Sequence, residues 1–240
     1  MNEPDRKSGV NWWLIGGLAF ALALALGIVG LVVGAKAWAS NTVERYTAVG
    51  PAKLPALTTT DADWRALQRR LGQFKRLVDA GEPAQLELTG EDLNTIIRRS
   101  PKHGEFKDLV WLNIDGDQII GRVSVPLKNV ETPMLKGMLE GRWLNGEATF
   151  YLGLSNGKAS LHMNDLKVND LPIPARFKAR FGKQNLLEKS YEDPEFRRLV
   201  GQFESITVAD GKLKIAVKPD ALTKENEKNL ERNRLDAPVE

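Results

Sequence analysis

The sequence contains no cysteine and only two histidines in 240 residues. The absence of cysteine excludes disulfides, thiolate nucleophiles, cysteine metal ligands and a lipid anchor attached to cysteine. His103 and His162 do not lie in the H-x-x-x-H spacing that places two imidazoles on one helix face. A Walker loop and a dinucleotide-binding glycine fingerprint are also missing from the sequence. We therefore expect no metal site and no cofactor.

A strong excess of one charge is missing as well. The formal net charge is +3, and the first 40 residues contribute +1 of it, so the remaining 200 residues carry only +2. General nucleic-acid binding normally needs a clearly basic domain, so this balance argues against it despite a pI near 9.0.

One long apolar run dominates the N-terminal part of the chain. Trp12–Ala35 contains neither charge nor proline. As a helix it extends roughly 36 Å at about 1.5 Å per residue, which exceeds the roughly 30 Å hydrocarbon core of a bilayer. Trp12, Trp13 and Trp38 suit the two interfacial aromatic belts. The pattern predicts a polar arm over 1–11 and a transmembrane helix over 12–35.

The orientation and processing of this helix stay open at the sequence level. Arg6 and Lys7 precede it while Lys36 and Arg45 follow it, so the positive-inside rule gives a tie. Ala37–Ser40 resembles a signal-peptidase site, but the apolar run is longer than the usual 7–15 residues of a signal peptide. The length favours a retained anchor.

Gly30 and Gly34 form a G-x-x-x-G pattern within the predicted span. Small residues at this spacing let two helices approach closely, so these glycines are candidate dimer contacts. The span is rich in glycine and alanine, so composition alone also explains the pattern.

The rest of the chain predicts an α+β domain over 61–219, preceded by a linker or extended lead-in over 36–60 and followed by a polar tail over 220–240. Thr60 or Asp61 can cap a helix that carries an apolar stripe and stops at Gly81. Further helices are expected after Thr89, over 175–189 and from Pro194.

About seven strands accompany these four helices, and three turn signals make their connections antiparallel. The signals are Asp115-Gly116, typical of a type I′ turn, Asn156-Gly157 and Asp210-Gly211. We expect one antiparallel and curved sheet packed with the helices. Whether the sheet encloses a cavity is left open, because cavity-lining and core strands share one alternation pattern.

Several short motifs together suggest a family resemblance. They are Leu88–Asn94, Gly141–Asn145, Val168–Pro172, Gln184–Leu186 and Ile206–Lys212. The stretch from about 85 to 218 resembles uncharacterised bacterial single-pass membrane proteins of the YpmS-like kind. That resemblance implies a domain on the outer side of the cytoplasmic membrane, and some domains of this appearance resemble tubular lipid-binding folds. The motifs themselves are caps and turns rather than catalytic signatures.

Two patterns resemble catalytic or metal-binding motifs without the required context. Gly153–Gly157 matches G-x-S-x-G, but a strand rather than a helix is expected after Ser155. Asn113–Asp117 has alternating oxygen ligands like the start of a calcium loop, without the downstream glutamate. We therefore expect no catalytic residues.

A basic segment carries the sequence-level candidate for a binding surface. Four cations alternate with two phenylalanines, and they are Arg176, Phe177, Lys178, Arg180, Phe181 and Lys183. Each cation near an anionic membrane contributes roughly 1 kcal/mol, so the segment can contact lipid headgroups or the acidic patch of a protein partner. An ordinary helix with an apolar core face and a solvated basic face has the same pattern.

These observations together favour a membrane-anchored, extracytoplasmic, non-enzymatic domain that binds lipid or another apolar ligand. The alternative is an interaction or scaffold module of a cell-envelope assembly. The sequence leaves the ligand, the partner and the oligomeric state undetermined.

Overall fold

The computed structural model describes residues 44–99, 108–127, 137, 139–175, 178 and 182–218. The predicted polar arm (1–11), the predicted transmembrane helix (12–35) with Gly30 and Gly34, and the predicted tail (220–240) lie outside the described residues. Within the described ranges, no helix is both long enough and apolar enough to cross a membrane.

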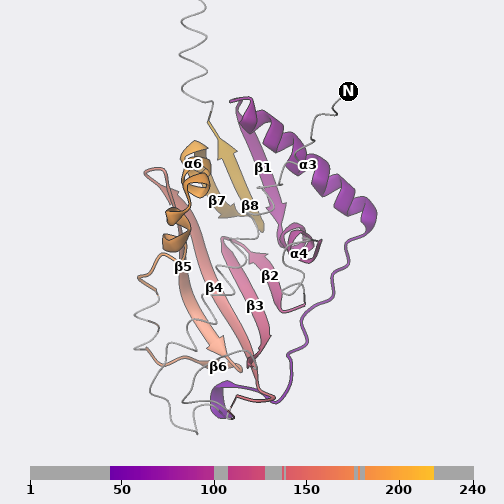
Figure 1. Cartoon of the computed structure of the whole chain (residues 1–240), viewed down its shortest axis with the longest axis vertical. Coiled ribbons are helices and arrows are strands. Elements are labelled where there is room, and N and C mark those ends of the chain that lie inside the picture. Colours follow the sequence, from indigo (N-terminus) through magenta and orange to yellow (C-terminus); the bar gives the residue numbers. More distant parts are fainter. Residues whose placement is uncertain are drawn as a thin grey trace, which may run out of the picture.

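Two antiparallel sheets form the domain, so the α+β prediction is confirmed (Figure 1). The three-stranded sheet has the order β1 (Ala84–Thr89), β8 (Lys212–Val217), β7 (Phe203–Ala209). The five-stranded sheet follows chain order: β2 (Val110–Asp115), β3 (Gln118–Pro126), β4 (Trp143–Ser155), β5 (Lys158–Val168), β6 (Leu171–Pro172).

The expectation of a single sheet is therefore corrected to two. Strand β1 does not join the next strands along the chain; it pairs with β8, more than 100 residues later, with Leu86 opposite Ile215. The alternation of apolar residues identifies each strand, but it carries no information about the partner strand.

The described helices are α3 (Asp61–Asp79), α4 (Gly90–Arg99), the 3₁₀ helix η4 (Glu188–Glu192) and α6 (Pro194–Gln202). Helix α3 runs along β1, α4 contacts both β1 and β2, and α6 packs on η4 and β5 (Figure 1). Thr60 caps α3 through a reciprocal capping box with Asp63, which resolves the choice between Thr60 and Asp61. Thr89 and Asp92 form the same box at α4, as predicted.

The first hairpin turn differs from its prediction by one position. The two-residue loop is Gly116-Asp117, since Asp115 pairs with Gln118 at the strand ends. Gly116 has a φ of 59°, while Asp117 has no positive φ, which is the type II′ rather than the type I′ pattern. The other two hairpins have their turns at Asn156-Gly157 and Asp210-Gly211, as expected, with positive φ at both residues.

The helix predicted over 175–189 does not extend that far. Ala175 and Lys178 are helical, but residues 182–187 form turns and η4 begins at Glu188. The N–H of Leu186 donates to the carbonyl of Leu161 on β5 at 2.9 Å. Hydrogen bonds to the sheet thus replace those that a continuing helix would make.

Residues 44–60, called the strap below, belong to the folded domain. Ala48 and Trp143 exchange two backbone hydrogen bonds of 2.8 Å, which adds an antiparallel bridge beside β4. Arg142 donates to the hydroxyl of Thr47 at 2.6 Å and to its carbonyl at 3.0 Å. Apart from a helical turn at residues 44–46, this part of the predicted 36–60 linker is an extended lead-in attached to the sheet rather than a free connection.

Candidate apolar ligand site

An apolar cavity lies against the inner face of the three-stranded sheet. The strand register places Leu86, Ile215 and Ile206 in one cross-strand row, and Leu88 with Leu213 in the next. All five side chains line the cavity. This wall exists only because β1 and β8, from opposite ends of the domain sequence, are hydrogen-bonded neighbours.

The other walls come from the helices and from the five-stranded sheet. Helices α3 and α4 contribute Leu71, Leu93 and Ile96. Strands β4 and β5 contribute Leu152 and Ala159. The remaining side chains are Leu187, which precedes η4, Phe196, Leu199 and Val200 on α6, and Phe203 at the start of β7. The cavity is partly open to the surface, and its volume is about 110 Å³.

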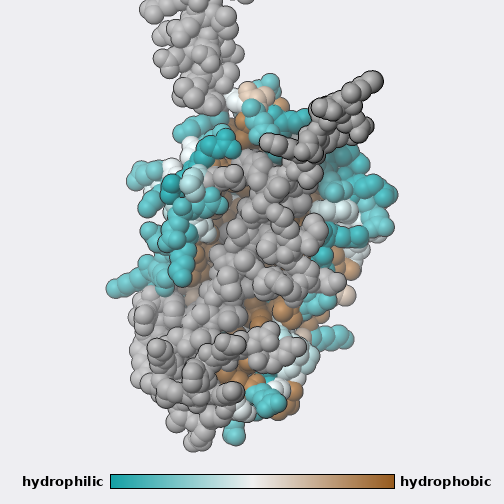
Figure 2. Space-filling view, in the orientation of Figure 1, coloured by the Kyte–Doolittle hydropathy of each residue, from teal (hydrophilic) through white to brown (hydrophobic). Residues whose placement is uncertain are grey.

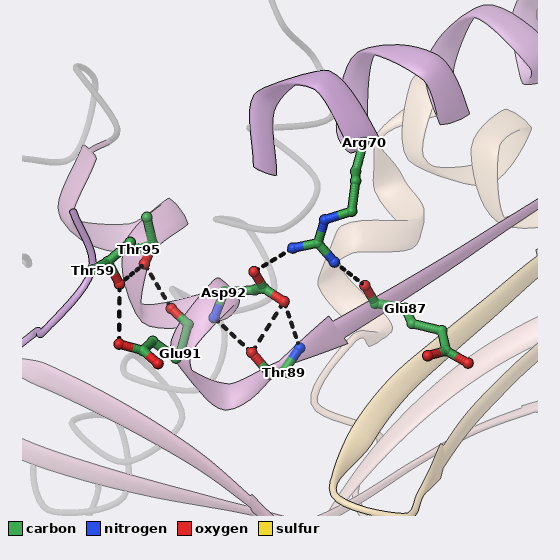
Figure 3. A network of polar contacts seen from close by, with 7 residues as sticks. All are labelled: Thr59, Arg70, Glu87, Thr89, Glu91, Asp92 and Thr95. Atoms are coloured by element: carbon green, nitrogen blue, oxygen red, sulfur yellow. Dashed lines mark hydrogen bonds and ion pairs between the residues drawn. The ribbon is translucent and has the colours of Figure 1, made fainter. Parts of the chain in front are cut away.

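A polar network on the outer side fixes the wall made by α3, β1 and α4 (Figure 3). Arg70 donates to the carbonyl of Glu87 at 3.0 Å and to the carboxylate of Asp92 at 2.5 Å. Asp92 also accepts from the N–H and the hydroxyl of Thr89. Each of the residues Arg70, Glu87 and Asp92 is followed directly in the sequence by a cavity-lining leucine. The network therefore holds three cavity-lining side chains in place, namely Leu71, Leu88 and Leu93.

The strap is attached to the same corner of the domain. The hydroxyls of Thr59 and Thr95 lie 2.7 Å apart, and Thr59 donates to the carboxylate of Glu91 at 3.3 Å (Figure 3). Thr95 donates to the Glu91 carbonyl one turn back along α4 at 2.8 Å. These contacts join the lead-in of α3 to α4, and so fix the two helices relative to each other.

Two side chains hold the opposite wall against the outer edge of β5. The amide of Asn185 accepts from the N–H of Leu161 at 3.0 Å and donates to the carbonyl of Ala159 at 3.2 Å. The Tyr191 hydroxyl accepts from the Ala159 N–H at 2.5 Å and donates to its carbonyl at 3.0 Å. Partial burial raises the pKa of Tyr191, which keeps the hydroxyl protonated as a donor.

Lys178, from the basic segment predicted from the sequence, lies on a different face. Tyr151 pairs with His162 while the adjacent Leu152 pairs with Leu161, and successive side chains of a strand point to opposite faces. Tyr151 and His162 line a broad cleft of about 450 Å³ with Lys178, while Leu152 lines the apolar cavity. Among the described residues, Lys178 thus lies on the other side of the five-stranded sheet from the cavity.

Lys178 and Lys183 are the predicted contact residues that the structure describes. Lys178 forms an ion pair with Asp165 at 3.0 Å, and both side chains are about half exposed. The hydrogen bond from Lys178 holds the pKa of the Asp165 carboxyl below its ordinary value. Lys183 is exposed. Arg176, Phe177, Arg180 and Phe181 lie outside the described residues.

The motif-like patterns of the sequence have ordinary structural roles. Ser155 ends β4, and Asn156-Gly157 turns the chain directly into β5, so no strand-to-helix nucleophile elbow exists there. Asn113 lies within β2 and Asp117 in the first hairpin turn. In the described part of the chain, no three histidine, aspartate or glutamate side chains gather closely enough to hold a metal ion.

Comparison with protein-family models, curated proteins and solved structures finds no match to this chain.

The role of the cavity-lining residues could not be recognised from the sequence. Leu86, Leu88, Leu213 and Ile215 each stand in an alternating strand pattern, which is the same for a filled core and for a cavity wall. The signal present in the sequence is that every second residue of β1 and of β8 is apolar, so the inner faces of both strands carry no polar side chain. Its meaning depended on knowing that these two strands pair.

Proposed function

We propose that this protein is a single-pass, membrane-anchored, extracytoplasmic domain that has no catalytic activity and binds a lipid or another apolar ligand. The observation that carries the proposal is the cavity of about 110 Å³, whose fifteen lining side chains are all apolar and come from both sheets and three helices.

The lining of the cavity determines which class of ligand it suits. Protein interiors are packed about as densely as organic crystals, and few of their voids exceed a water molecule. A space lined only by apolar groups tends to stay dry, and an apolar guest that fills it makes favourable van der Waals contacts with the walls. The cavity is therefore suited to an apolar ligand and unsuited to a polar one.

The proposed anchor would hold this domain close to a supply of apolar ligands. Trp12–Ala35 has the length and composition of a transmembrane helix of the cytoplasmic membrane. The resemblance to outward-facing bacterial domains supports an extracytoplasmic position. In this proposal the anchor provides location and the folded domain provides binding.

Native mass spectrometry of residues 41–240, followed by organic extraction, tests the function. We expect an adduct of lipid size that survives purification and an apolar molecule in the extract. A clean mass without any extractable lipid would contradict apolar-ligand binding. If one protein partner were then captured in stoichiometric amount, the scaffold function would replace it.

A further inference from the structure

We propose that the cavity accepts the free end of an unbranched alkyl chain, with the polar head of the ligand left outside. This inference rests on the proposed function, because it names the part of the ligand that the apolar site binds. Three properties of the cavity carry it: the chemistry of its walls, its size and the position of its partly exposed side chains.

The walls provide no group that could orient a polar ligand. Ligand pockets usually combine apolar walls with a few polar groups that fix the orientation of the ligand. Here all fifteen lining side chains are hydrocarbon, from leucine, isoleucine, valine, alanine and phenylalanine. The polar network of Arg70 and Asp92 points away, toward Thr89 and the Glu87 carbonyl (Figure 3). The bound portion of the ligand must therefore be hydrocarbon.

The volume favours a chain end over a fused-ring molecule. An engineered apolar cavity of about 150 Å³ accepts benzene, which is a single ring. The present cavity has about 110 Å³, so a fused ring system such as a sterol would overlap its walls, while a flexible chain end can follow them. The space is also far too small for a complete lipid.

The exposure of the lining residues indicates where the chain enters. Leu71, Leu152, Phe196 and Ile215 are partly exposed, and the other eleven lining residues are buried. Hydrophobic surface is visible beside the hydrophilic side chains in the region of α6, which carries Phe196 (Figure 2). In this arrangement the chain enters past the partly exposed residues, and its terminal methyl group lies against the buried ones.

Photo-crosslinking of the full-length chain in phosphatidylcholine vesicles tests this placement. Two forms of palmitic acid serve as probes, one with a diazirine at the methyl end and one with a diazirine next to the carboxylate. We expect the methyl-end probe to label peptides of the buried part of the cavity wall, including those with Leu93 and Leu199. The carboxylate-end probe should not label them.

Two variants give a matched comparison. Ala159→Phe places a ring in the cavity, because Ala159 is buried in its wall, and should lower the methyl-end labelling at least tenfold. Ala62→Phe makes the same change at an exposed position of α3 and should leave the labelling unchanged. Because a phenylalanine at 159 can unfold the domain, competition on the unchanged chain is the second measurement. Unlabelled palmitic acid should displace the probe, and cholesterol should not.

Equal labelling of the walls by both probes, or displacement by cholesterol as efficient as by palmitic acid, would overturn the chain-end inference. So would the absence of wall labelling. Each of these results leaves apolar-ligand binding itself intact if native mass spectrometry still finds an adduct, so failure of the inference is distinguishable from failure of the proposed function.

Discussion

Three asparagine side chains in this domain take the place of peptide groups. Each side-chain amide offers one acceptor and two donors, and so can pair with a backbone N–H and a backbone C=O at once. Asn94 accepts from the N–H of Leu112 at 2.8 Å and donates to its carbonyl at 2.7 Å, at the edge of β2. Asn185 pairs in the same way with β5, and Asn145 with the strap at Gly50 and Ala52.

Asn94→Ala should destabilise the domain by about 3 kcal/mol. The change leaves the N–H and the carbonyl of Leu112 without these partners at a buried strand edge, and each unsatisfied group costs about 1–3 kcal/mol. The free energy of unfolding in urea measures the effect. Asn113→Ala, at an exposed position on the same strand, is the control and should change stability by less than about 0.5 kcal/mol. Equal effects of the two changes would rule out this role of Asn94.

At the residue scale, the sequence predicted local roles and missed tertiary ones. The caps at Thr60 and Thr89 were predictable, since a capping box is a pattern of residues three apart. The roles of Asn94 and Asn185 were not predictable, because each depends on a strand that is distant in sequence. Ser124 is a further example: it is buried and accepts a hydrogen bond from the N–H of Ala52 on the strap at 3.0 Å.

Among the elements, α4 has the most constrained position. It follows β1 without a loop, contacts both sheets and carries Asn94. Its first residue, Gly90, lies so close to β2 that an added Cβ would be 3.2 Å from the Cα of Asn113 and 3.2 Å from the carbonyl oxygen of Leu112. The missing side chain therefore allows this helix to close the edge of β2.

Gly90→Ala and Gly72→Ala should have opposite effects, although both replace a helical glycine. Gly90→Ala should destabilise the domain by about 1–3 kcal/mol, because the backbone of β2 must move away from the new methyl group. Gly72→Ala in α3 meets only the end of the Arg76 side chain at 4.0 Å, so it should stabilise by about 0.5–1 kcal/mol. Thermal unfolding of both variants checks the prediction, and a gain of stability at position 90 would contradict it.

The positions of the helices and strands were largely predictable, but the grouping of strands was not. Tight hairpins connect β2 with β3 and β4 with β5, and their turns are visible in the sequence. The pairing of β1 with β8 has no local signal. The helix expected over 175–189 failed for a similar reason, since the edge of β5 takes up hydrogen bonds that the sequence alone assigns to the helix.

At the scale of the whole molecule, the start of the strap and the cavity lie toward opposite ends (Figure 1). The start of the strap lies at the lower end of the five-stranded sheet, while β1, β8 and α6 lie in the upper half of the view, where the β4–β5 hairpin also reaches (Figure 1). Strand β4 runs between them over 13 residues, or about 40 Å at roughly 3.3 Å per residue. The presence of the cavity could not be predicted, because it results from this arrangement rather than from any one segment.

If Trp12–Ala35 spans a membrane, the lower end of the domain should face the bilayer. Residues 36–43 bridge at most about 30 Å even when fully extended. The chain has no cysteine, so Glu140→Cys near the lower end and Glu82→Cys at the upper end each give a unique labelling site. Both side chains are exposed. Energy transfer to a fluorescent lipid should be stronger from position 140, and stronger transfer from position 82 would contradict this orientation.

The attachment of the strap also has a mechanical consequence. Tension on the chain N-terminal to residue 44 would act first on the hydrogen bonds from Arg142 to Glu44 and Thr47. It would act next on the two hydrogen bonds between Ala48 and Trp143, and then on those of Asn145 with Gly50 and Ala52. These bonds lie one after another along the strap, so they would open in sequence while both sheets stayed intact. Releasing residues 44–52 would add about 30 Å of extended chain. Release of the strap would thus lengthen the chain that leads into the domain while the two sheets remain folded.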